Sequence, residues 1–276
     1  MRTWSFAKGH GTLNDFVLLT DRNGWLDPSP ADVRFLCDRR RGIGADGILR
    51  AVRTEHVPNW AGPDDLWFMD YRNADGSVAE ICGNGLRVFA RWLIDQDLVS
   101  DDVSDIATRA GLRQARALPD GRIAVTMGQP HWDPAEVRFD YAGRSWTGHQ
   151  VNVGNPHIVV QLADAAELAA LDLSAPAKFD PAVAPQGANL EFVWAAAASR
   201  LTMRVLERGV GETMSCGSGV VAAALDARAR AGGHPDALQV DVPGGHLTVR
   251  FDDTDGASLI GPAVIVAEGE VSLPDD

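Results

Sequence analysis

Two short stretches of similar sequence decide the fold of this chain: EICGNG at residues 80–85 and MSCGSG at residues 214–219. Each contains Cys-Gly-x-Gly and continues directly into an apolar, helix-forming run. This layout predicts a cysteine at the glycine-rich start of a helix, where unpaired backbone N–H groups and the helix dipole favour negative charge. Such a thiol ionises more easily than a free one, whose pKa is about 8.5. We therefore expect Cys82 and Cys216 to be a symmetric pair that acts on one substrate.

The segments around these two stretches predict two halves of similar build. After the first cysteine, apolar residues from Leu86 to Leu98 recur at helical spacing, which predicts an amphipathic helix that ends near Asp97. After the second cysteine, residues 220–231 are apolar on nearly all faces, which predicts a helix enclosed by a sheet. Strand-forming segments flank both helices. These segments are 4–11, 13–19, 48–52, 66–71, 240–251 and 263–267.

Two further helices and a domain boundary are expected. Ser29 is a capping residue followed by Pro30, which predicts a helix that runs to about Arg39. The stretch from 162 to 173 is rich in Ala and Asp and predicts a solvated helix. The turn at 119–121 (Pro-Asp-Gly) lies near the middle of the chain and is the expected boundary. Two halves of about 135 residues fit the common domain size.

Composition excludes several classes of protein. The chain has 276 residues, of which 45% are hydrophobic, so it can bury a normal core. Its net charge of −13 argues against nucleic acid and anionic membrane surfaces as partners. The N-terminus has no apolar leader, and no run of about 18 apolar residues follows. Three cysteines are an odd count that suits a reducing compartment. We expect a soluble, cytoplasmic protein.

Two residue types bear on cofactors and on the third cysteine. The only lysines are Lys8 and Lys178, which disfavours a pyridoxal-phosphate enzyme because that cofactor needs a Schiff-base lysine. Cys37 lies in the expected helix that begins at Pro30, and we interpret it as a buried structural thiol.

Four kinds of chemistry are open to the cysteine pair. A redox couple usually shows a close Cys-x-x-Cys, and these two residues are remote in sequence. A zinc site needs further ligands at short spacing, and no His or Cys lies within four residues of either cysteine. A cysteine hydrolase needs one cysteine and a histidine base, for which His157 is a candidate, but it leaves the second cysteine idle.

The fourth possibility uses both cysteines. One thiolate removes a proton from a carbon acid and one thiol donates a proton to the opposite face, which inverts the centre. A thiol with a lowered pKa suits such work near neutral pH. Without an imine cofactor, hydrogen-bond donors must stabilise the carbanion through the substrate carboxylate. Two helix N-termini supply such donors, and the glycines let the backbone come close.

Polar residues elsewhere are candidates for supporting roles. His157 follows a tight X-Pro turn in VNVGNPH (151–157), where a hydrogen-bonded core histidine is an equal alternative. Glu207 and Arg208 come just before the second cysteine, which favours a place in the active-site wall over the surface position usual for such a pair. Asn189 lies at a strand entry in GANLEF.

With these residues in place, the chain resembles the diaminopimelate epimerase family, whose members interconvert LL- and meso-diaminopimelate without a cofactor. The resemblance covers nearly the whole chain. It rests on KGHGTLNDFV (8–17), RGIGADG (41–47), NADGSVAEICGNGLR (73–87), VNVGNPH (151–157), GANLEF (187–192) and ERGVGETMSCGSG (207–219).

The resemblance implies roles for individual residues. Cys82 deprotonates the LL isomer and Cys216 the meso isomer, and His157 and Glu207 match positions that tune and orient the thiols. Gly83, Asn84, Gly217 and Ser218 match the loops whose N–H groups hold the reacting carboxylate. The residues that match positions gripping the distal amino-carboxylate end are Asn14, Asn73, Asn155, Asn189 and Arg208.

The resemblance also implies an architecture. We expect two pseudo-symmetric domains, each a curled, mostly antiparallel sheet around a central helix, with the active site in the interdomain cleft. The first domain spans 1–118 and is joined by the C-terminal strand 262–276; the second spans 119–261. A homodimer, a small-molecule substrate, and no cofactor or metal are implied as well.

Three positions depart from the family pattern, and none of them is one of the two cysteines. Leu13 stands where a glycine is usual, so a local difference in that loop is expected. Gly47 stands where some members have Gln, and Val88 replaces a frequent Cys.

Two rival functions remain open. One is another cofactor-independent racemase, of the proline or hydroxyproline type, although a proline substrate does not need Arg208 for a second carboxylate. The other is a non-catalytic binding or redox protein in which Cys82 and Cys216 form a disulfide. If both thiols flank one carbon they can oxidise together, so we predict that oxidation inactivates the enzyme.

Overall fold

The computed structural model describes residues 2–100 and 103–274 of the chain. The chain folds into two compact units, each with its own interior. Unit 1 comprises Met1–Val125 and Pro262–Asp276, and unit 2 comprises Thr126–Gly261. The change of unit falls inside strand β7 (Ile123–Gly128), a few residues after the turn at 119–121 where we expected it.

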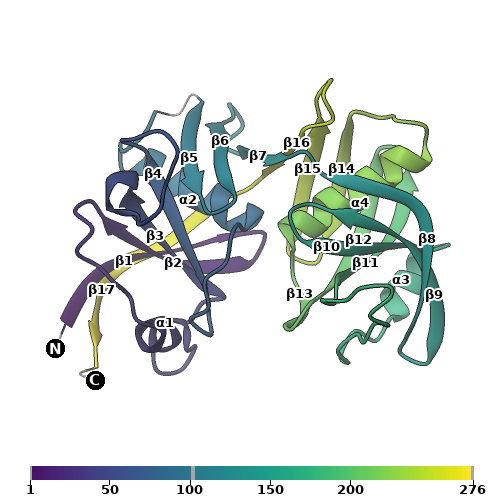
Figure 1. Ribbon diagram of the computed structural model, residues 1–276, viewed down its shortest axis with the longest axis horizontal. Coiled ribbons are helices and arrows are strands. Elements are labelled where there is room, and N and C mark those ends of the chain that lie inside the picture. The colour runs from purple at the N-terminus through teal and green to yellow at the C-terminus, as the bar shows by residue number, and fades with distance from the viewer. Residues whose placement is uncertain (1, 101–102, 275–276) are drawn as a thin grey trace. The chain divides into compact units, whose positions relative to one another are not determined.

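Unit 1 is a curled sheet around one helix (Figure 1). Its strands pair in the order β17-β1-β2-β3-β4-β5-β6-β7, and only β2–β3 and β4–β5 are parallel. Each parallel pair requires a crossover, which α1 and α2 provide. The elements are β1 (Arg2–Gly11), β2 (Asn14–Asp21), α1 (Pro30–Cys37), β3 (Gly47–Arg53), η1 (Thr54–His56), β4 (Trp67–Asn73), α2 (Gly83–Asp95), β5 (Ser104–Thr108), β6 (Gly111–Ala117), β7 and β17 (Val264–Leu273).

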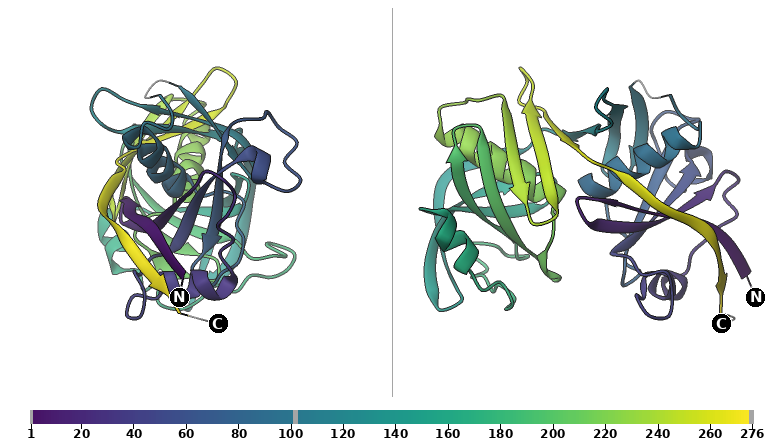
Figure 2. Two further views of the ribbon diagram at one scale, coloured as in Figure 1. Left: turned by 90° about the vertical axis from the view of Figure 1, so that its left-hand side faces the viewer. Right: turned by 180° about the vertical axis from the view of Figure 1, so that it is seen from behind.

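The last strand of the chain belongs to the first unit. β17 runs antiparallel beside β1 from Arg2↔Leu273 to His10↔Val264, so the first and last strands lie side by side (Figure 2). The register shifts once, between Lys8 and Gly9, where a bulge bends the pair.

Unit 2 repeats this plan with other residues. Its strands pair in the order β8-β9-β10-β11-β12-β14-β15-β16, with the short β13 also on β12. The parallel pairs are β10–β11 and β12–β14, joined through α3 and α4. The elements are β8 (His131–Tyr141), β9 (Arg144–Asn152), β10 (Pro156–Gln161), α3 (Ala165–Ala170), β11 (Asn189–Ala197), β12 (Arg200–Glu207), β13 (Gly211–Thr213), α4 (Gly217–Arg230), β14 (Ala237–Val242), β15 (Gly245–Phe251) and β16 (Ala257–Gly261).

The two central helices are the cores of their units. α2 packs against β1, β2, β6 and β17, and α4 packs against β9, β10, β11 and β12 among others. Leu86, Phe89 and Leu93 of α2 are completely buried, and so are Val220 and Val221 of α4. Burying one such side chain contributes about 1.5–3 kcal/mol. The expected fold class, with two pseudo-symmetric curled sheets around central helices, is therefore confirmed.

Two helices are shorter than the sequence predicted. α3 covers only Ala165–Ala170. Its N-cap is Asp164, whose side chain accepts a hydrogen bond from the Glu167 N–H. It is not simply solvated, because Leu168 packs into a buried cluster. α1 ends at Cys37 instead of near Arg39.

Candidate functional site

Cys82 and Cys216 have the same local geometry, each in its own unit. Each is the N-cap of a central helix, with φ/ψ of −139°/117° at Cys82 and −120°/113° at Cys216. The N-cap residue is extended while the residues after it are helical, so its side chain lies beside the unpaired N–H groups of the first turn. We name each cysteine and its polar neighbours the Cys82 half-site and the Cys216 half-site.

In the Cys82 half-site the thiol lies within a small amide cluster. The Gly85 N–H donates to Cys82 Sγ at 3.3 Å, and Sγ lies 3.7 Å from Asn14 Oδ1. The Asn84 side chain donates to the same Asn14 oxygen at 3.3 Å, while Asn14 Nδ2 donates to Asp46 at 2.8 Å. Asn14 therefore joins the start of β2 to the start of α2, and three of the predicted site residues lie together.

Charged residues fix the segment that carries Asn14. Asp15 pairs with Lys8 at 2.6 Å and with Arg39 at 2.7 Å. Burial by itself raises the pKa of Asp15, but hydrogen bonds from Arg39 and Lys8 outweigh it and hold the pKa well below the usual carboxyl range. Lys8, one of only two lysines, is thus part of the support of this half-site.

Asn73 lies at the end of β4, in register with the start of the neighbouring strands. Gly47 of β3 pairs with Phe16 on one side and with Asn73 on the other. The Asn73 side chain donates to Ser77 Oγ at 3.0 Å. A Cβ at Gly47 would lie 2.6 Å from the carbonyl oxygen of Arg72, so this backbone has no space for the Gln that some family members carry.

The other departures from the family pattern also have a structural setting. Thr12 and Leu13 form the two-residue turn between β1 and β2, with φ of 52° and 63°. A hairpin turn with two positive φ values favours glycine, which explains why a glycine is usual at the position of Leu13. Leu13 adopts the same backbone region despite its Cβ. Val88 is completely buried on α2.

The Cys216 half-site surrounds its thiol with acidic groups. Gly217 and Ser218 form the first turn of α4, and Ser218 Oγ lies 3.5 Å from Cys216 Sγ. Only 7% of Cys216 is exposed. Burial, and then the negative charges of Glu207 and Glu191, raise the pKa of the Cys216 thiol well above its usual value. The lowered pKa that the helix start predicted is therefore wrong for this thiol, because burial and two nearby carboxylates outweigh the helix terminus.

Glu207 is held at the end of β12. Thr213 Oγ1 donates to Glu207 Oε1 at 2.5 Å. Burial raises the pKa of this carboxyl, and the hydrogen bond from Thr213 opposes that rise. A buried carboxyl with a raised pKa beside a thiol is typical of a functional site.

His157 is a buried residue of a polar network in unit 2. Its Nδ1 lies 2.7 Å from Glu191 Oε1, and its Nε2 lies 2.9 Å from Asn155 Oδ1. The parallel register of β10 and β11 places His157 opposite Asn189. A Cβ at Gly219 would lie 2.6 Å from Glu191 Oε1, so this carboxylate contacts the first turn of α4. His157 is therefore both buried and next to a proposed catalytic helix.

Glu191 is a residue that the sequence analysis did not single out. It is completely buried, and its Oε2 has no hydrogen-bond partner within residues 2–100 and 103–274. The signal was present in NLEFV (189–193), where a lone carboxylate interrupts an apolar strand. A charge at such a position needs a partner, because an unpaired buried carboxylate is very costly.

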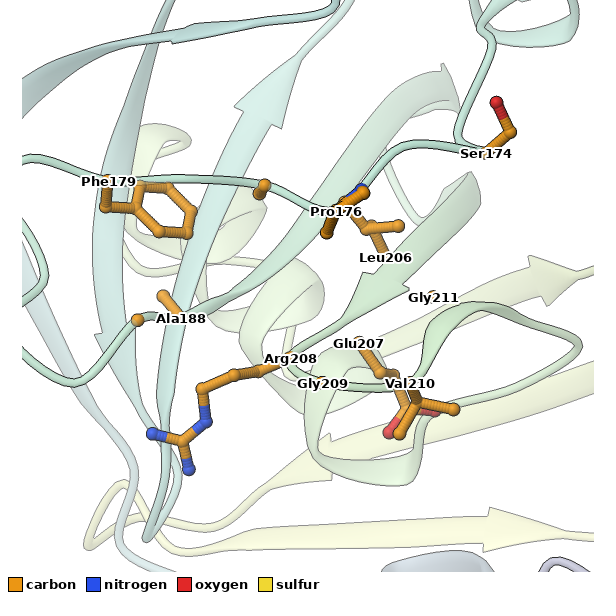
Figure 3. A pocket seen from close by; sticks show the side chains of 12 residues that line it. Ser174, Pro176, Phe179, Ala188, Leu206, Glu207, Arg208, Gly209, Val210 and Gly211 are labelled. Atoms are coloured by element: carbon orange, nitrogen blue, oxygen red, sulfur yellow. The ribbon is translucent and has the colours of Figure 1, made fainter.

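Arg208 lies beside this network at the wall of a small cavity. The Arg208 backbone N–H donates to Asn189 Oδ1 at 2.8 Å, and its guanidinium donates to the Gln186 carbonyl oxygen at 2.9 Å. The cavity has a volume of about 220 Å³ and is lined by Glu207 and Arg208 among others. Figure 3 shows the Arg208 side chain extending away from those of Glu207 and Val210.

Hydrogen bonds and charge thus connect most of the expected site residues within their own units. Within residues 2–100 and 103–274 there is no group of three or more His, Cys, Asp or Glu side chains arranged to hold a metal ion. In that same part of the chain, every helix is too short or too polar to cross a membrane.

Solved structures of low sequence identity share the fold. A hydroxyproline epimerase from Agrobacterium vitis superposes with a TM-score of 0.70 at 14% identity, covering 99% of this chain and 94% of that one. A phenazine biosynthesis protein of the PhzF family from Bacillus anthracis gives 0.69 at 16% identity, covering 99% and 100%.

Sequence comparison defines the relationship more closely. Diaminopimelate epimerase from Thermobifida fusca is 49% identical over 97% of this chain and 98% of its own length. The enzyme of that name from Corynebacterium glutamicum (strain R) is 47% identical over 98% and 99%. The family model described as diaminopimelate epimerase matches residues 6–132 and 149–273. The match includes both cysteine motifs and all the polar residues of the two half-sites, and the chain therefore belongs to the diaminopimelate epimerase family.

Proposed function

We propose that this protein interconverts LL- and meso-2,6-diaminopimelate by a two-base mechanism in which Cys82 and Cys216 are the acid/base pair. Family membership makes the chain an amino-acid epimerase, and relatives at 47% and 49% identity are named for this substrate. One thiolate takes the proton from the α-carbon, and the other thiol gives a proton to the opposite face. The proton count is balanced, because the thiolate that takes the proton becomes a thiol while the thiol that gives a proton becomes a thiolate.

The observation that carries the proposal is the matched N-cap geometry of the two cysteines. Stereoinversion needs two equivalent groups, and a pseudo-symmetric fold provides them from two copies of one local structure. The third cysteine, Cys37, has no such setting, because it is the last residue of α1 and not an N-cap. Burial raises the pKa of its thiol to about 12. It lies in a hydrophobic cluster.

The first turns of α2 and α4 have the donors that the carbanion requires. Gly83 and Asn84 begin one helix, and Gly217 and Ser218 begin the other. Backbone N–H groups at a helix start and the positive end of the helix dipole favour an anion, so they suit the α-carboxylate, on which negative charge develops as the proton leaves. Because these donors are fixed before the substrate binds, little reorganisation is needed in the transition state.

The remaining residues suit the distal amino-carboxylate end. Arg208 has five N–H donors, and Gln186 uses one of them, so the guanidinium retains donors for a carboxylate. Amide side chains distinguish an ammonium from a carboxylate, because the amide oxygen accepts a hydrogen bond from the ammonium and the amide N–H donates one to the carboxylate. The amides proposed for this role are Asn14, Asn73, Asn155 and Asn189. A substrate of the proline type does not need this second set of groups.

Proton NMR in heavy water tests the proposal. Reduced protein is incubated with LL-diaminopimelate, and the Cα–H signal is followed. We expect loss of the signal together with appearance of the meso isomer. Exchange with proline or hydroxyproline alone would keep the chemistry and overturn the substrate, and no exchange with any of them would overturn the function.

We further propose that the protein works as a cytoplasmic homodimer. The family resemblance supports the dimer, and the odd count of three cysteines, which suits a reducing compartment, supports the location. Light scattering of the purified protein tests the dimer, because a monomer mass at assay concentration contradicts it.

A further inference from the structure

Arg87 is a fully buried cation on α2 that has only neutral hydrogen-bond partners in the described part of the chain. Its Nη1 donates to the Gly83 carbonyl oxygen at 3.3 Å, its Nη2 to Thr12 Oγ1 at 3.3 Å, and its Nε to the Pro262 carbonyl oxygen at 3.5 Å. Its exposed fraction is 0%. Three other arginines of unit 1 differ from Arg87, because each of them pairs with a buried carboxylate. Arg50, Arg72 and Arg109 all contact Asp70.

A buried guanidinium without a carboxylate is an unfavourable arrangement that needs another source of negative charge. Burial lowers the pKa of Arg87 to about 10, while the nearby charge of Cys82 opposes that fall. At neutral pH the side chain is still cationic. Within residues 2–100 and 103–274, Cys82 is the ionisable group that acts electrostatically on it.

The geometry fixes this cation at the first turn of α2, which Cys82 caps. The Arg87 side chain turns back along α2 to the carbonyl of Gly83, the residue that directly follows Cys82. The end of β1 approaches closely enough that a Cβ at Gly11 would lie 3.0 Å from Arg87 Nη2 and 3.1 Å from the Asn84 carbonyl oxygen. Gly11 and Thr12 therefore confine the guanidinium to one position.

We propose that Arg87 is a positioning residue that holds Cys82 as the thiolate, so that the resting protein carries its base at Cys82 and its acid at Cys216. The inference rests on the proposed function of the two cysteines as an acid/base pair. A charge interaction is reciprocal: a thiolate that favours the guanidinium is itself favoured by it to the same extent.

The Cys216 half-site has no counterpart of Arg87. The residue five positions after Cys216 is Val221, which is completely buried and apolar, whereas Arg87 is five positions after Cys82. The charged groups that raise the pKa of Cys216 are instead the carboxylates of Glu207 and Glu191. The same N-cap position therefore has a cation in one unit and anions in the other.

The test is a direct titration of Cys82, independent of turnover. In a Cys37→Ala/Cys216→Ala background Cys82 is the only thiol, and its ionisation is followed by thiolate ultraviolet absorbance and by the pH dependence of iodoacetamide alkylation. Arg87→Met removes the charge with similar shape and is expected to raise the pKa of Cys82 by on the order of one unit, which lowers the thiolate fraction about tenfold at pH values below that pKa. Arg87→Lys keeps the charge and is expected to restore most of that loss.

Controls separate this inference from a structural role and from the proposed function. In a Cys37→Ala/Cys82→Ala background, Arg87→Met is expected to leave the pKa of Cys216 unchanged. An unchanged Cys82 pKa in folded Arg87→Met, or an equal rise with Arg87→Lys, overturns the inference. If Arg87→Met does not fold, the titration of Cys82 with Arg87 intact decides: a pKa at or above the ordinary thiol value overturns it. Exchange of the substrate Cα–H, measured separately with all three cysteines present, shows whether the cysteines are catalytic at all.

Discussion

The Cys82 and Cys216 half-sites have the same backbone and opposite electrostatics. Both cysteines cap a central helix with nearly equal dihedral angles, and both helices begin with Gly-x-Gly. Around Cys82 the buried charge is the cation Arg87. Around Cys216 it is the carboxylates Glu207 and Glu191, and the pKa of the Cys216 thiol is raised by burial and by these charges.

In the proposed mechanism, this difference lets a repeated fold hold the proton on one side only. Two identical half-sites would have equal intrinsic pKa values, so neither thiol would be favoured as the base. An acid/base pair needs one of each before the substrate arrives. The backbone repeat supplies the matched positions, and a few buried side chains that are not repeated assign the roles.

Removal of either thiol is expected to have the largest effect on the rate of epimerisation. Cys82→Ala and Cys216→Ala are each expected to lower the rate of epimerisation at least about a hundredfold in both directions, because general acid–base catalysis contributes about 10²–10⁴ for a single group. The measurement is the interconversion of LL- and meso-diaminopimelate. Cys37→Ala is the matched control and should retain activity, since Cys37 lies in a hydrophobic cluster. Full turnover by either of the first two variants would remove that cysteine from the mechanism.

Alkylation at neutral pH compares the two thiols within one molecule. The thiolate is the reactive form, and its fraction at Cys216 stays small until the pH approaches the raised pKa. We expect iodoacetamide to modify Cys82 at least about tenfold faster than Cys216 at pH 7, with the ratio falling as the pH rises. Peptide mass spectrometry after timed quenching gives both rates. Equal rates at pH 7 would mean that the two half-sites do not differ in charge as described.

Glu191→Gln tests the contribution of a buried carboxylate to the Cys216 half-site. The substitution removes a negative charge that raises the pKa of Cys216, so that pKa should fall by on the order of one unit. It also removes the carboxylate that pairs with His157 at 2.7 Å, and we expect kcat to fall about tenfold or more. Titration of Cys216 and the pH profile of kcat measure the two effects.

Glu212→Gln is the control for that experiment. Glu212 pairs with Arg204 in a partly exposed position, and it is not among the groups that shift the pKa of Cys216. If both substitutions change the Cys216 pKa equally, the effect belongs to the net charge of the unit and not to the buried network.

The smallest expected effect concerns the turn before Asn14. Leu13 is half exposed with a φ of 63°, so Leu13→Gly relieves backbone strain without loss of packing. We expect the free energy of unfolding to rise by about 1 kcal/mol, measured by urea denaturation. Leu13→Ala keeps the Cβ and should give little gain. A loss of stability in Leu13→Gly would show that the leucine side chain supports the turn.

Sequence patterns were sufficient for the repeat and for the place of the two cysteines at helix starts. The helices after both cysteines, the helix after Ser29 and the flanking strands are local patterns, and all were confirmed. The ends of α1 and α3 were not, because a helix ends where packing and capping outweigh propensity, as at Leu168 and Asp164. Glu191 was passed over because its partner His157 is 34 positions away along the chain.

The sequence alone was enough to predict that Cys82 and Cys216 lie at helix starts, because spacing, glycines and apolar runs are properties of neighbouring residues. Only the tertiary structure decided which charges surround each thiol. Arg87 is in the motif that ends at residue 87, and its position in the sequence does not show that it is buried. Its burial requires α2 to pack against Gly11 and Thr12 and also against Pro262, which lie far apart in sequence. The physical reason is that a charge acts through space, and its strength depends on burial, which no local pattern records.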